Sequence, residues 1–166
     1  MVMDDLYRCR GKQAESVFDF GPEAVKRSLK RIYEKDFHPM TDVELEMFEA
    51  AWKTLNIATD KGFGARKPDD PDYDFYREIR ENNAVFAAFK VHRAQNDMAA
   101  LLLDENGNLR PFEQWMKLVM PIADHQMVQW LRTEYDTAVI RAHQAADWRQ
   151  FEREKDIPVS YTHLRA

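Results

Sequence analysis

A polar helix with a seam of small residues runs through positions 132–151, RTEYDTAVIRAHQAADWRQF, and constrains the fold more than any other stretch. Its apolar positions recur at helical spacing and are Tyr135, Ala138, Ala142, Ala145, Trp148 and Phe151. Because alanine has a short side chain, the three alanines let a second helix approach closely. The segment therefore predicts an interior helix of a helical bundle.

Two shorter helices are predicted near the start of the chain. The first begins at Pro22, because proline at the first helical position loses no needed hydrogen bond, and it runs to about Phe37, ahead of another proline. The second follows Thr41 and Glu44, which match a capping box in which the two residues satisfy each other's backbone donors. This helix is expected to end near Thr59.

Three more helices are predicted downstream. A long helix spans about Tyr73–Leu103, and the turn at 104–108 then reverses the chain, since Asn-Gly readily supplies positive φ. The next helix begins at Pro111 and is kinked or ended by Pro121. The last helix, Asp124–Lys155, is expected to be capped by its own first residue.

These signals predict an all-α fold, an elongated bundle of about five helices. A minor short hairpin near residues 101–110 is the alternative at the turn, because Asn-Gly also favours β-hairpins. The expected segments are a poorly ordered N-terminus at 1–20, a helical pair at 21–59, a linker at 60–74, a main helical body at 75–157 and a non-native tail at 158–166.

The linker is predicted from its composition. Two glycines, two prolines and a cluster of aspartates in DKGFGARKPDDPDYD bury little and cannot sustain a helix. The aspartates lack the spacing of a calcium-binding loop. We therefore expect a solvated connection without a metal.

Composition limits the class of protein. A chain of 166 residues is long enough for one domain with a sizeable core, and 45% hydrophobic with 32% charged residues is typical of an ordered, soluble protein. No apolar run approaches the ~20 residues that cross a bilayer, and the N-terminus lacks the apolar core of a signal peptide. Cys9 is the single cysteine, which excludes an internal disulfide and favours a reducing compartment such as the cytoplasm.

The sequence holds no recognisable catalytic, cofactor-binding or metal-binding motif. No histidine outside the C-terminal tail follows a glutamate at the spacing of a di-iron site, and the zinc-protease and phosphate-loop motifs are absent. His143 and Asp147 stand one helical turn apart but supply too few ligands for zinc. We expect them to form a hydrogen-bonded or surface pair.

One local basic face departs from the net charge of −5. Its members are Lys26, Arg27, Lys30, Arg31 and Glu34, opposite an apolar face of Val25, Leu29, Ile32 and Tyr33. Such a face is usually solvated, and the alternative is contact with an acidic partner or packaged nucleic acid. Arg132 and Glu134 are expected to join a partly buried charge network that fixes helix register.

Two of these stretches resemble a known family. The Arg-Thr-Glu start at 132–134, the alanines spaced down a helix and the closing aromatic resemble the phage Mu F-like minor head (head morphogenesis) proteins. The run FAAFKVHRAQNDMAALLLDENGNLRPFEQW, at 86–115, looks like the helical part of such proteins. The resemblance covers roughly residues 22–157, with its parts in the expected order.

The resemblance implies a structural protein of a tailed phage or prophage that is not an enzyme. It would bind portal and capsid proteins inside the capsid or at the portal vertex, with packaged DNA as a further contact. Neither a membrane nor a small-molecule substrate or cofactor is implied. The implied location is the virion head, and the bacterial cytoplasm during assembly. The alternatives are a small helical nucleic-acid-binding or regulatory protein and an enzyme of unrecognised type.

The last eight residues, Val159–Ala166, look like translated sequencing-adapter read-through. Members of the family continue instead into a segment with a tryptophan strand and a Cys- or His-containing motif. We therefore expect a C-terminally truncated fragment with a non-native tail. The alternative is a native, frayed C-terminus.

Overall fold

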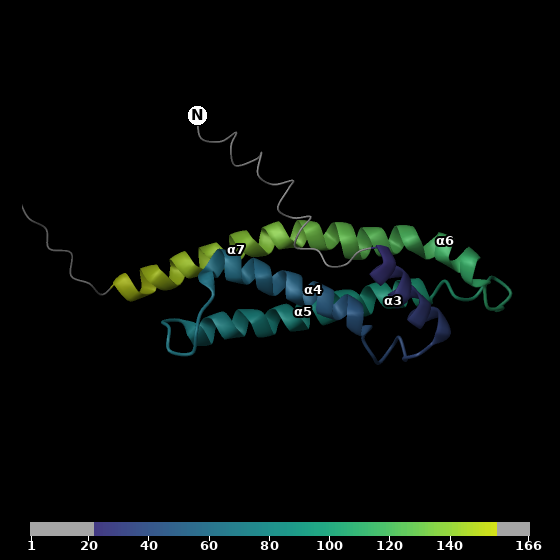
Figure 1. Cartoon of the computed structure of the whole chain (residues 1–166), viewed down its shortest axis with the longest axis horizontal. Coiled ribbons are helices and arrows are strands. Elements are labelled where there is room, and N and C mark those ends of the chain that lie inside the picture. Colours follow the sequence, from purple (N-terminus) through teal and green to yellow (C-terminus); the bar gives the residue numbers. More distant parts are fainter. Residues whose placement is uncertain (1–21, 156–166) are drawn as a thin grey trace, which may run out of the picture.

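The computed structural model describes residues 22–155 and confirms an all-α, elongated helical bundle (Figure 1). In chain order its helices are α3 (Pro22–Glu34), α4 (Leu45–Thr59), the π-helical η1 (Asp60–Gly64), α5 (Tyr73–Ala99), α6 (Phe112–Ala123), the π-helical η2 (Asp124–Gln129) and α7 (Trp130–Glu154). The predictions for the N-terminal segment and for the tail from Val159 lie outside the described residues.

The helices form a long, narrow body. The continuous rod of α6, η2 and α7 runs along one side, α5 runs along the other, and α4 lies between them (Figure 1). α4 packs against both α5 and α7, whereas α3 crosses one end and contacts α4, α5 and α6. The central helix α4 therefore connects the two long sides of the molecule, which are α5 and the rod of α6, η2 and α7.

The predicted amphipathic character of α3 is confirmed. Val25, Leu29 and Ile32 are buried, because they recur on one side of the helix. The helix ends at Glu34, earlier than predicted, because Lys35 adopts a left-handed conformation with φ 57°. The backbone N–H of the next residue then closes the helix end by donating to the Arg31 carbonyl at 3.2 Å.

The predicted capping box of α4 is wrong. Thr41 donates its hydroxyl to Asp42 at 3.2 Å, and Glu44 itself stands at the N-cap, where its carboxylate accepts from the Met47 N–H at 2.8 Å. The backbone N–H groups of Thr41 and Asp42 both donate to the His38 carbonyl. This tight turn occupies the backbone around Thr41, so the helix begins only after Glu44.

Part of the predicted linker is helical. Residues 60–64 continue α4 as η1, and Phe63 is buried there, so the prediction that this stretch cannot sustain a helix is wrong. The reason is close packing: a Cβ on Gly62 would stand 2.3 Å from the Val139 carbonyl oxygen and 2.8 Å from the Ala142 Cβ. The alanine seam of α7 thus receives a helical neighbour, as its composition predicted.

Two aspartates of the same region hold its ends in place. Asp60 accepts from the Tyr76 hydroxyl at 2.5 Å and from Arg80 at 2.7 Å. Asp72, whose side chain is 5% exposed, pairs with Arg149 at 3.0 Å and with Arg153. Burial, together with the hydrogen bond to Asp60, raises the pKa of the Tyr76 hydroxyl. Residues 60–72 are therefore bonded to both α5 and α7.

The predicted cap at Asp124 is also wrong, and Pro121, predicted to kink or end its helix, does not end it. Pro121 lies inside α6, and the chain continues through the wider turns of η2 into α7. Proline has no N–H and its ring displaces a carbonyl of the preceding turn, and a π-helical segment accommodates such a disruption without ending the helix. Asp124 does not cap the N-terminus of the last helix; it stands at the C-cap of α6, and its carboxylate accepts from the Gln129 side chain at 2.5 Å.

The turn between α5 and α6 combines both predictions made for it. Leu103 and Leu109 form an isolated antiparallel bridge, which is the minor hairpin, while α5 and α6 flank it. Gly107 takes φ 81°, and Asp104 accepts from the backbone N–H groups of Asn106 and Asn108 at 2.9 and 2.8 Å. The backbone bonds to its carboxylate, led by that of Asn108, lower the pKa of Asp104.

Candidate functional site

Two cavities open between α5 and the rod formed by η2 and α7, one of about 340 Å³ and one of about 460 Å³. Both are bounded by the same two walls, and the Phe86 and Trp130 rings separate them with their centroids 5.8 Å apart. We call them together the α5–α7 groove. The volume of each cavity lies in the range of ordinary ligand sites.

Both walls of the groove follow a helical 3–4 spacing. The α5 wall consists of Phe75, Ile79, Asn82, Asn83, Phe86, Lys90 and Arg93. The opposite wall consists of Gln126, Trp130, Glu134, Ala138, Arg141 and Ala145, with His125, Gln129, Thr133 and Ala142 beside them. Such spacing places each set along one side of its helix. These residues are distinct from the α5 stripe of Ala87, Val91, Ala94 and Met98, which is buried in the main core.

The larger part of the smaller cavity is apolar. Leu55 of α4 lies at its base, and Phe75, Ile79 and Ala145 line its sides. A single ion pair borders it, in which Arg141 donates to Glu134 at 3.1 Å. The Glu134 side chain is 16% exposed and that of Arg141 70% exposed, so the pair lies at the border between the cavity and the solvent.

Arg132 and Glu134 differ in their position relative to the groove. Glu134 joins a partly buried charge pair, as expected, but its partner is Arg141 of the same helix. Arg132 is exposed and lines neither cavity. The structure therefore places the threonine and the glutamate of the Arg-Thr-Glu sequence at the groove, and not the arginine.

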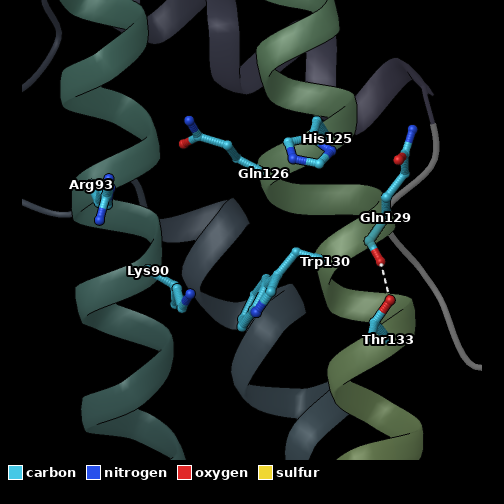
Figure 2. A pocket seen from close by; sticks show the side chains of 7 residues that line it. All are labelled: Lys90, Arg93, His125, Gln126, Gln129, Trp130 and Thr133. Carbon is cyan, nitrogen blue, oxygen red and sulfur yellow. Dashed lines mark hydrogen bonds between the residues drawn. The ribbon is translucent and has the colours of Figure 1, made fainter.

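The larger cavity carries basic side chains (Figure 2). Lys90 and Arg93 extend from α5, and His125 and Trp130 stand across from them. The Lys90 ammonium lies 5.3 Å from the centroid of the Trp130 ring and 5.7 Å from that of Phe86, within cation–π range. Within residues 22–155, neither Lys90 nor Arg93 forms an ion pair with a carboxylate.

Two carboxylates are bound by glutamines that line this cavity. Asp97 accepts from the Gln126 amide at 2.9 Å, and Asp124 accepts from that of Gln129 at 2.5 Å. Both glutamines line the cavity, and their amide groups, not the cations of the cavity, bind these two carboxylates. The basic end of the groove thus keeps cationic groups that no acid of the described chain neutralises directly.

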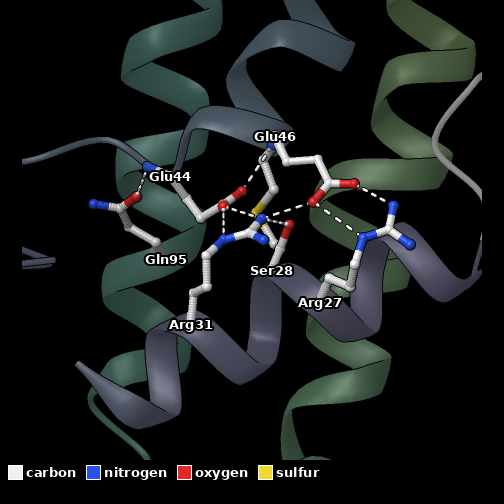
Figure 3. A network of polar contacts seen from close by, with 7 residues as sticks. Arg27, Ser28, Arg31, Glu44, Glu46 and Gln95 are labelled. Atoms are coloured by element: carbon white, nitrogen blue, oxygen red, sulfur yellow. Dashed lines mark hydrogen bonds and ion pairs between the residues drawn. The ribbon is translucent and has the colours of Figure 1, made fainter. Parts of the chain in front are cut away.

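The basic face of α3 differs from the basic end of the groove, because its cations are surrounded by carboxylates (Figure 3). Arg27 pairs with Glu46 at 2.5 Å, and Arg31 pairs with Glu46 at 2.8 Å and with Glu44. The remaining pairs of this face are Lys26–Glu23 at 2.9 Å and Lys30–Glu34 at 3.6 Å. Each of the four cations therefore has an acidic partner, which lowers the positive potential that the face offers to nucleic acid.

Two of these ion pairs shift a carboxyl pKa. The Arg27 hydrogen bond, and then that of Arg31, holds the pKa of Glu46 below its ordinary value of 4.5. Glu44 is 2% exposed, and its carboxylate both caps α4 and binds Arg31. This pair joins α3 to α4, with the Glu44 carboxylate buried and the Arg31 side chain 33% exposed.

Gln95 of α5 completes the same network and was not identified from the sequence. Its fully buried amide accepts from the Glu44 N–H at 2.9 Å and donates to the carbonyls of Pro39 and Asp42 at 2.7 and 2.5 Å. A glutamine in a helix is ordinarily read as a surface residue. No sequence signal indicates that three backbone groups of a distant turn meet this one.

His143 and Asp147 lie 3.1 Å apart with 66% of each side chain exposed, which confirms the predicted surface pair. Within the described part of the chain, no three His, Cys, Asp or Glu residues are grouped so that they could hold a metal ion. None of the helices between residues 22 and 155 combines the length and the apolar character needed to span a membrane.

Comparison with known proteins finds no match: no family model, no curated protein and no solved structure corresponds to this chain. The resemblance to Mu F-like head proteins therefore stays a prediction from the residues that carry it.

Proposed function

We propose that this chain is a structural protein that acts by binding other proteins. The observation that carries the proposal is the α5–α7 groove, which consists of two cavities between two helical walls. Large apolar side chains remain exposed along the same helices, namely Phe89 at 72%, Trp148 at 60% and Phe151 at 61%. Covering one such side chain contributes roughly 1.5–3 kcal/mol, so a protein partner would stabilise this surface.

The identity of the partners is proposed from the family resemblance. The stretches at 86–115 and 132–151, which resemble Mu F-like head proteins, contribute about half of the residues of the two groove walls. The partners would then be portal and capsid proteins of a tailed phage or prophage. The chain would act in the host cytoplasm during assembly and remain in the virion head.

Nucleic-acid binding through the α3 face is the weaker candidate. Neutralising DNA phosphates requires cations that can give up their present partners at little cost. Arg31 holds the buried Glu44, and releasing it would leave that carboxylate without its cation. The ion pairs of α3 therefore favour a structural role for these residues over a DNA contact.

The proposal is tested by assembly. The chain is co-expressed with the portal and capsid proteins encoded in the neighbouring reading frames, and the heads are separated by gradient sedimentation. We expect the chain to sediment with heads or portal rings, and the double variant W148S/F151S to do so less. The exposed variant R77S is the matched control. Heads that form without the chain, or steady turnover of a small molecule by the purified chain, would contradict the proposal.

A further inference from the structure

The groove has the form of a helix-binding site with one helix missing. α4 supports both walls from one side, and on the other side the walls leave two cavities separated by the Phe86–Trp130 contact. The 3–4 spacing of both walls is the pattern with which helices receive the ridge of another helix. From this geometry we propose that the α5–α7 groove binds one amphipathic helix of a partner protein, with acidic residues at the end that meets Lys90 and Arg93.

The length of the walls sets the length of this helix. From Phe75 to Arg93 the α5 wall advances about 18 residues, or ~27 Å at 1.5 Å per residue. The bound segment is therefore a helix of about five turns. Its apolar residues would recur every three or four positions, so that they enter the cavity lined by Phe75, Ile79 and Ala145.

The charges of the groove set the chemistry of the helix. Glu134 and Arg141 neutralise each other in the middle, so no charge is required of the occupant there. At the other end Lys90 and Arg93 have no carboxylate partner among the described residues, and Lys90 is already oriented by the rings of the groove. Carboxylates of a bound helix would supply the missing partners through charge-assisted hydrogen bonds.

A polyanion fits the groove less well than a helix does. A nucleic-acid strand could meet Lys90 and Arg93, but the cations near Phe75 and Ile79 already have acidic partners. Arg149, whose guanidinium lies 5.4 Å from the Phe75 ring centroid, is bound by Asp72 and Glu152, and Arg141 is bound by Glu134. The apolar cavity would remain uncovered or would require an unpaired charge beside it, which is unfavourable. An acidic amphipathic helix satisfies both ends of the groove at once. This inference rests on the proposed protein-binding function and names the class of partner.

The test uses the full chain and a synthetic peptide probe. The probe is a fluorescein-labelled helical peptide of about 20 residues with leucine at 3–4 spacing and three glutamates at one end. Fluorescence anisotropy is expected to show saturable binding with one peptide per chain. The K90E/R93E double variant is expected to weaken binding by about tenfold or more, and a peptide with lysines in place of the glutamates should restore it. The K117E variant, on the exposed side of α6, is the charge-reversal control and should bind as the parent chain does.

A second variant keeps the test valid if the charge reversal disturbs folding. Asn82 is exposed at the edge of the apolar cavity, so N82W places a large ring in the groove without replacing a core side chain. We expect N82W to abolish peptide binding while Tm is unchanged.

Several outcomes would overturn the inference. One is no binding at ~1 mM peptide, the weakest affinity that we would regard as specific. Equal affinity for the glutamate and lysine peptides is another. Displacement of the peptide by a single-stranded oligonucleotide, or a dimer of the chain that N82W dissociates, would assign the groove to nucleic acid or to a second copy. A chain that enters phage heads but fails these tests would lose the groove assignment and keep the proposed function.

Discussion

The basic face of α3 and the basic end of the α5–α7 groove contain the same types of residue in opposite surroundings. On α3, Arg27 and Arg31 are bound by Glu44 and Glu46 of the following helix. In the groove, Lys90 and Arg93 contact aromatic rings or solvent and have no acidic partner within residues 22–155. The denser cluster of positive charge in the sequence is thus the less available one.

The cause of this difference is tertiary. The turn between α3 and α4 returns the chain so that its first helical residues face the α3 stripe, and these residues are acidic. α5 and η2 also run side by side, but the acids Asp97 and Asp124 bind glutamine amides there. Charge clusters therefore indicate function only after their partners are known.

Removal of the acid that neutralises α3 is expected to have the largest effect. Glu44→Ala deletes the cap of α4 and leaves Arg31 without its buried partner, so the free energy of unfolding should fall by about 3 kcal/mol in urea titrations. Glu46→Ala, whose carboxylate is 31% exposed, should cost only about 1 kcal/mol. Equal effects of the two variants would contradict the distinction between buried and exposed pairs.

A smaller loss is expected from the amide that supports this acid. Gln95→Ala leaves the Glu44 N–H and two carbonyls without partners in a closed site, which should cost about 2 kcal/mol. The matched control is Gln126→Ala in the groove, expected to change the free energy of unfolding by no more than about 0.5 kcal/mol. A thermal or urea denaturation in which Gln126→Ala loses more stability than Gln95→Ala would contradict this expectation.

The two regions should also contribute differently to the loss of stability at low pH. The folded-state pKa of Glu46 is depressed, so its stabilising contribution is present above the ordinary pKa of 4.5 and is lost as the pH falls through the lower folded value. Urea titrations from pH 6 down to about pH 3 should therefore show a decline in stability that Glu46→Gln makes shallower. Lys90→Met should leave that slope unchanged. If Glu46→Gln has the parent slope, the ion pairs of α3 do not hold this pKa.

The smallest change in stability is expected from the groove cations. Because Lys90 and Arg93 have no ion pair to lose, K90A/R93A should alter the free energy of unfolding by less than about 0.5 kcal/mol, measured by urea titration. The same variant should weaken binding of the glutamate peptide. A large loss of stability would mean that these cations serve the fold instead of a partner.

Periodic features of the sequence predicted most of the fold. The alternation of Val25, Leu29 and Ile32 with charged residues identified α3, and the small residues around Ala142 identified a close helix contact. Both patterns report burial of one side of a helix, which depends on the local sequence alone.

Features set by distant contacts were missed. Gly62 was read as a helix breaker, although its missing side chain is what allows η1 to pack on α7. The sequence predicts a cap at Thr41 and a kink or an end at Pro121. The turn around Thr41 moves the cap to Glu44, and the chain continues past Pro121 into a π-helical segment. Lys90 and Arg93 belong to no recognisable motif. They form a site only because α5 and η2 lie beside each other.

The most direct test of the groove as a binding site is an NMR titration of the four tryptophan indole N–H signals with the glutamate peptide. Trp130 lines the groove, whereas Trp115 is fully buried in the core with its indole N–H donating to the Met98 carbonyl at 3.1 Å. We predict that the Trp130 signal shifts with saturation and that the Trp115 signal stays in place. A stationary Trp130 signal while the peptide binds would contradict the account.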